Sequence, residues 1–91
     1  MVTWDKETRV PVIIQTGKGS VDITIPDLEM TVHGTDYLSA IALAVLRSSA
    51  VYYYNLEHNL PTTLNYSYAE VERMALKKGK GAFATLLRLS E

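Results

Sequence analysis

The chain has no cysteine and almost no net charge. Its 91 residues carry 9 Lys and Arg against 10 Asp and Glu, a formal net charge of −1. The missing cysteine excludes disulfides and thiolate chemistry and fits a reducing cytosol, so we expect a cytoplasmic protein. The balanced charge gives no sign of a general nucleic-acid binder. Segment 1–9 is polar and charged, so we expect no signal peptide there.

A long uninterrupted hydrophobic run is also missing. Segment 37–54 has the length of a membrane span, but Arg47, Ser48 and Ser49 interrupt it. An arginine at the centre of a spanning helix costs about 3 kcal/mol. We therefore expect a buried helix here and no membrane association. The length and the 47% apolar share predict one domain, residues 1–91, around a single core.

Three segments in the first part of the chain have the patterns of β-strands. Residues 10–15 are rich in β-branched side chains, and residues 21–25 alternate between apolar and polar. The glycine-containing segment 16–20 between them predicts a hairpin turn. Residues 28–33 alternate again, which places Leu28, Met30 and Val32 toward the core. These segments predict an antiparallel sheet.

Two helices and a last strand should follow. Thr35 or Asp36 caps a helix expected to reach about residue 57, and segment 59–63 breaks it. A capping box at Ser67 and Glu70 predicts a short helix through Leu76. Residues 82–89 form an apolar strand, expected inside the sheet and, after a right-handed return, parallel to the first strand. The predicted fold class is therefore α+β with the order β-β-β-α-α-β and the long helix on one face.

The long helix is apolar over most of its surface. Arg47 is the only charged residue between Asp36 and Glu57. The three tyrosines of segment 52–54 point in three different directions, so they cannot all face one core. The small sheet covers one face of the helix, so a second copy or a partner should cover the rest. The residues expected at this partner or oligomer interface are Tyr37, Leu46, Tyr53 and Tyr54.

Residues that carry chemistry are few. The segment 17–20 lacks most of a phosphate-binding loop and joins two strands instead of opening a helix. His33 and His58 are isolated, and no cysteine completes a zinc site. Asp22 and Glu29, with Asp27, supply too few carboxylates for a two-metal nuclease, which is the least favoured alternative. We predict no catalytic residue, metal or cofactor, and no enzyme.

The stretch that begins at Ile25 resembles the N-terminal domain of HicB-family antitoxins. The residues that carry the resemblance are Pro26, Asp27, Leu28, Gly34, Ala40, Ile41 and Ala44, together with Gly81-Ala82-Phe83 near the end. The similarity extends roughly from Val10 to Leu89. Ile25 stands where the family usually has an aromatic residue, and Thr35-Asp36 invert the usual Asp-Thr.

The resemblance implies a partial RNase H-like fold without catalytic carboxylates. It also implies a protein that binds and covers a small RNA-cleaving toxin. Many family members carry a further DNA-binding domain, and because the chain stops at Glu91 we expect no direct DNA binding. An alternative is a homo-oligomeric structural or phage accessory protein that has no toxin partner.

Overall fold

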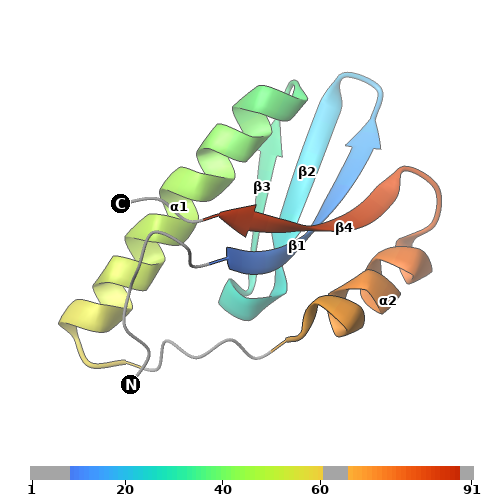
Figure 1. The fold of residues 1–91 in the computed structure, drawn as a ribbon. Coiled ribbons are helices and arrows are strands. Elements are labelled where there is room, and N and C mark those ends of the chain that lie inside the picture. Colours follow the sequence, from blue (N-terminus) through green and yellow to red (C-terminus); the bar gives the residue numbers. More distant parts are fainter. Residues whose placement is uncertain (1–8, 61–65, 89–91) are drawn as a thin grey trace.

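The described part of the chain forms four strands and two helices (Figure 1). The computed structural model describes residues 9–60 and 66–88. In chain order its elements are β1 (Arg9–Gly17), β2 (Ser20–Ile25), the 3-10 turn η1 (Pro26–Leu28), β3 (Met30–Gly34), α1 (Tyr37–Glu57), α2 (Tyr68–Lys78) and β4 (Ala82–Arg88). The strands form one sheet in the order β3-β2-β1-β4, and every pairing is antiparallel. The α+β class and the element order are as predicted.

The first three strands form two consecutive hairpins. Gly17 pairs with Ser20, and Gly19 takes the positive φ of 68° that the tight turn requires. The alternation predicted for residues 21–25 is confirmed, because Val21, Ile23 and Ile25 are buried. The third strand was expected to begin at Leu28 but begins at Met30. Segment 26–28 instead forms a 3-10 turn, which ends at Glu29 with a φ of 51°.

The two helices cover opposite faces of the sheet. Apolar side chains of β1 to β3 pack against α1 in the main core, whose members include Val12, Ile14, Ile23, Val32, Ala40 and Ala44. Successive strand residues point to opposite faces, so Ile13 points the other way and packs against Val71 and Ala75 of α2. Figure 1 shows α1 along β3 and β2, and α2 beside β1 and β4. The long helix therefore covers one face, as predicted.

The last strand differs from the prediction in direction and position. It was expected to lie parallel to the first strand and inside the sheet, but β4 pairs antiparallel with β1 at the sheet edge. The cause is α2, which returns along the second face and leads through the turn at Gly79–Gly81 directly into β4. This arrangement does not support the expected partial RNase H-like fold.

The start of α1 is fixed by a cap and by a close contact. The Asp36 carboxylate accepts a hydrogen bond from the backbone N–H of Ser39 at 2.8 Å, so Asp36, one of the two predicted residues, is the cap. Just before it, Gly34 lies against the helix. A Cβ on Gly34 would come within 2.7 Å of the backbone nitrogen of Ala40. Only glycine lets β3 and α1 approach this closely.

The remaining sequence predictions concern chain ends and connections. In the described ranges, no helix is sufficiently long and apolar to cross a membrane. The capping box is confirmed in its first half, since Ser67 Oγ accepts a hydrogen bond from the Glu70 N–H at 3.2 Å. The Glu70 carboxylate accepts from the Ser67 hydroxyl, at 3.2 Å, in place of the expected bond from the Ser67 backbone N–H. The predicted polar N-terminus, most of the predicted break at 59–63 and the end of the last strand at Leu89 lie outside the described residues.

Candidate functional site: the outer face of the long helix

The side of α1 that faces away from the sheet is apolar and uncovered. Ala42, Leu46, Ala50 and Tyr54, which we call the outer face, recur every four residues and are all exposed. Leu46 is 68% exposed and Tyr54 is 56% exposed. On the inner side, Ala40, Ala44 and Ser48 are fully buried. Because the sheet takes the inner side, this outer apolar strip has no neighbour among residues 9–60 and 66–88 that buries it.

Three of the four predicted interface residues lie together. Leu46 and Tyr54 belong to the outer face, and the half-buried Tyr53 flanks it. Tyr37 is 47% exposed at the first residue of α1. It lies nine residues before Leu46, which places it about 180° around the helix, so it does not join the others. Ala42 and Ala50 were missed, although their spacing of four residues around Leu46 was visible in the sequence.

The outer face carries two charges of opposite sign at its borders. Arg47 and Glu57 are both exposed, and neither forms an ion pair within the described part of the chain. The ring of Tyr54 stacks against the ring of His58, with 4.2 Å between centroids and a tilt of 40°. The C-terminal end of the face is therefore formed by an aromatic pair and a carboxylate.

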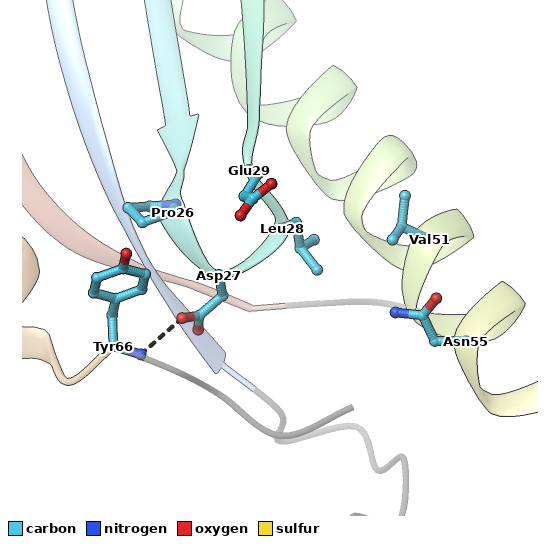
Figure 2. Close-up of a pocket in the computed structure, with 7 residues that line it drawn as sticks. All are labelled: Pro26, Asp27, Leu28, Glu29, Val51, Asn55 and Tyr66. Carbon is cyan, nitrogen blue, oxygen red and sulfur yellow. Dashed lines mark hydrogen bonds between the residues drawn. The ribbon is translucent and has the colours of Figure 1, made fainter. Parts of the chain in front are cut away.

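A pocket of about 380 Å³ lies where η1 meets the C-terminal half of α1 (Figure 2). Leu28 and Glu29 approach it from the turn, and Val51 and Asn55 from the helix. The Asp27 carboxylate accepts a hydrogen bond from the backbone N–H of Tyr66 at 2.9 Å. This contact ties the segment before α2 to the turn after β2. Asp27 therefore has a structural role in this wall of the pocket.

The sheet face beside α2 is polar where it lies over β2 and β3. His33 Nδ1 and Asp22 Oδ1 lie 2.6 Å apart, and the hydroxyls of Thr24 and Thr31 lie 3.3 Å apart. The Asp22–His33 pair was not anticipated. The alternation of segments 21–25 and 28–33 contained the signal, because it placed Asp22 and His33 on the same outward face of two adjacent strands.

The carboxylates that a nuclease would need are not brought together. Asp22 sits opposite His33, whereas Glu29 lies beyond the Ile25–Met30 pair at the end of the hairpin. No group of three or more His, Cys, Asp or Glu side chains suited to a metal ion occurs among residues 9–60 and 66–88. Among the described residues, Asp22 and Glu29 therefore do not form the metal site that the nuclease alternative requires.

Comparison of the chain with protein-family models, curated proteins and solved structures finds no match. The residues of segment 26–40 that the sequence analysis singled out have definite places in this fold. Pro26, Asp27 and Leu28 form η1, and Gly34 lies against Ala40 at the start of α1. The motif thus builds the connection that positions the long helix on the sheet.

Proposed function

We propose that this chain is a non-catalytic protein-binding module, and that another protein chain docks on the outer face of α1. The observation that carries the proposal is the exposure of Leu46 and Tyr54 in the middle and at the end of an apolar strip. Full burial of a large apolar side chain such as leucine is favourable by about 1.5–3 kcal/mol. Tyrosine is also enriched where proteins meet.

The partner class that we propose is a small RNA-cleaving toxin, which the module neutralises by covering it as a HicB-like antitoxin. One support is the resemblance described above. A second is charge, because segment 20–57 contains Arg47 as its only Lys or Arg against five carboxylates, Asp22, Asp27, Glu29, Asp36 and Glu57. Proteins that bind RNA present positive surfaces, and an acidic partner attracts them and speeds association.

Co-expression with the product of the neighbouring gene tests this proposal. A tagged chain should co-purify with that product, and Leu46→Asp should reduce the recovered partner at least tenfold, because a carboxylate is then buried in an apolar interface. Leu76→Asp is the matched control, since Leu76 is 75% exposed on α2, away from the outer face. Equal recovery with the two variants would contradict docking on α1.

A second candidate function is a homo-oligomeric structural or phage accessory protein without a toxin partner. The opposite charges of Arg47 and Glu57 favour it, because they make the outer face complementary to itself. A stable multimer that captures no other protein on co-expression would select this candidate.

A further inference from the structure

We propose that in the free protein a second copy of this chain covers the outer face of α1, with the two α1 helices antiparallel across a two-fold axis. The inference rests on the proposed function in one respect, that this face binds protein. It adds the identity of the occupant and its orientation. A toxin that docks on the same face must displace the second copy.

The shape of the outer face suits a helix of the same kind. Ala42 and Ala50 are small and alternate along the helix with the larger Leu46 and Tyr54. The side chains at the contact set the distance between packed helices, so alanines here allow a close approach. In an antiparallel pair centred on segment 47–57, Tyr54 of one helix lies at the height of Ala50 of the other and fills the space over it. Two copies related by a two-fold axis use the same surface twice.

The charges of the outer face select the antiparallel orientation. Arg47 and Glu57 are ten residues apart, about 15 Å along the helix axis. When the two-fold axis passes near the middle of segment 47–57, Arg47 of each copy lies at the same height as Glu57 of the other. Two opposite-charge pairs form in this way. A parallel pair would instead place the two arginines side by side and the two glutamates side by side, which is repulsive.

The segment between the two charges supplies the centre of the contact. Ala50, Tyr53 and Tyr54 lie between Arg47 and Glu57, and Tyr54 already packs on His58. A central apolar and aromatic patch with charges at its rim is the usual arrangement of protein interfaces. Antiparallel helices also oppose their macrodipoles favourably.

Charge reversal tests the arrangement in solution. The mass of the untagged full chain should be measured by sedimentation equilibrium over a wide concentration range, and we expect a reversible dimer. Arg47→Glu alone and Glu57→Arg alone each place like charges at both pairs, so each should raise the dimer Kd about tenfold. The double variant should regain the Kd of the unchanged chain.

A mixture of the two single variants gives the sharpest result. The Arg47→Glu chain and the Glu57→Arg chain carry complementary charges at the two positions. In the antiparallel pair both contacts between these two chains join opposite charges, so the mixture should form heterodimers more tightly than either variant forms homodimers. Arg73→Glu, on α2, is the control reversal and should leave the Kd unchanged.

Each outcome separates this inference from the proposed function. A chain that stays monomeric at every concentration but binds the neighbouring gene product through Leu46 overturns the second copy and leaves the protein-binding face intact. A dimer whose Kd is the same in the unchanged chain and in both single charge reversals overturns the antiparallel arrangement. A chain that stays monomeric, and whose recovery of the neighbouring gene product is unchanged by Leu46→Asp, overturns both the second copy and the protein-binding face.

Discussion

At the scale of single residues, Gly34 has the most restricted environment among the glycines of the fold. Its absent side chain leaves room for the backbone of Ala40, and a Cβ would meet three Ala40 atoms between 2.7 and 2.9 Å away. Two of these are backbone atoms of α1, which cannot rotate aside. The contact joins the last residue of β3 to the first turns of the helix that carries the outer face. Gly34 thus links the packing of the core to the position of the outer face.

Gly34→Ala should destabilise the protein by about 1–3 kcal/mol, because the added methyl forces β3 and α1 apart. Urea unfolding followed by circular dichroism measures the change. Gly17→Ala is the matched control, since its added Cβ meets only the Ser20 hydroxyl, at 3.2 Å, which is able to turn away. The control should change stability by less than about 0.5 kcal/mol. Equal effects of the two variants would argue against the close contact.

At the scale of elements, α2 decides the topology of the sheet. It packs Val71 and Ala75 on Ile13, on the face opposite α1, and turns through Gly79–Gly81 into β4. The Tyr68 hydroxyl also donates to the carbonyl of Ala84 at 3.2 Å. The start of α2 is thereby joined to the edge strand that follows it.

Ser67→Ala removes the cap of α2 and should destabilise the protein by about 1 kcal/mol. For a domain of this size, that corresponds to a fall in Tm of roughly 4–8 °C. Thermal unfolding measures it, with Glu72→Ala as the control, because Glu72 is exposed on the same helix. A fall in Tm no larger than that of the control would mean that the hydrogen bonds between Ser67 and Glu70 do not hold the start of the helix.

Local patterns predicted the elements well and their assembly less well. The alternation at Val21, Ile23 and Ile25 and the helix cap at Ser67 depend on neighbours in the chain, so the sequence reveals them directly. The direction of β4 depends on α2, because this second helix crosses the sheet once more before the chain turns into β4. The place of α2 depends in turn on the distant contact of Val71 and Ala75 with Ile13. Apolar composition alone placed β4 inside the sheet, but its half-exposed Phe83 and Leu86 belong to an edge.

The candidate surface was predictable to a similar degree. The near absence of charge in α1 is enough to indicate an uncovered apolar side, and Leu46 and Tyr54 lie on that side. Tyr37 does not lie on that side. It was chosen because tyrosine is abundant in the chain, and abundance does not tell on which side of the helix a residue lies. The packing of Ala40 and Ala44 against the sheet fixes the inner side, and only this packing defines which side is the outer one.

At the scale of the whole molecule, charge is divided between two regions. Segment 20–57 is acidic, whereas segment 66–88 contains five cations, Arg73, Lys77, Lys78, Lys80 and Arg88, against Glu70 and Glu72. The net charge of −1 hides this division. The outer face of α1 lies within the acidic segment of the sequence, but its own borders carry one charge of each sign, Arg47 and Glu57. The proposed basic partner and the proposed second copy would compete for this face.

The most direct test of the proposal that protein covers the outer face uses the absence of cysteine. Leu46→Cys and Leu76→Cys each introduce a single thiol, and Leu46 and Leu76 are 68% and 75% exposed in the isolated chain. Labelling rates with a maleimide reagent should be measured over a range of protein concentrations and divided by the rate in urea. We predict that the thiol at position 46 is labelled several-fold more slowly at high concentration and approaches the rate at position 76 on dilution. Equal rates at every concentration would contradict the second copy. Equal rates that persist when the neighbouring gene product is added would contradict a protein-covered outer face.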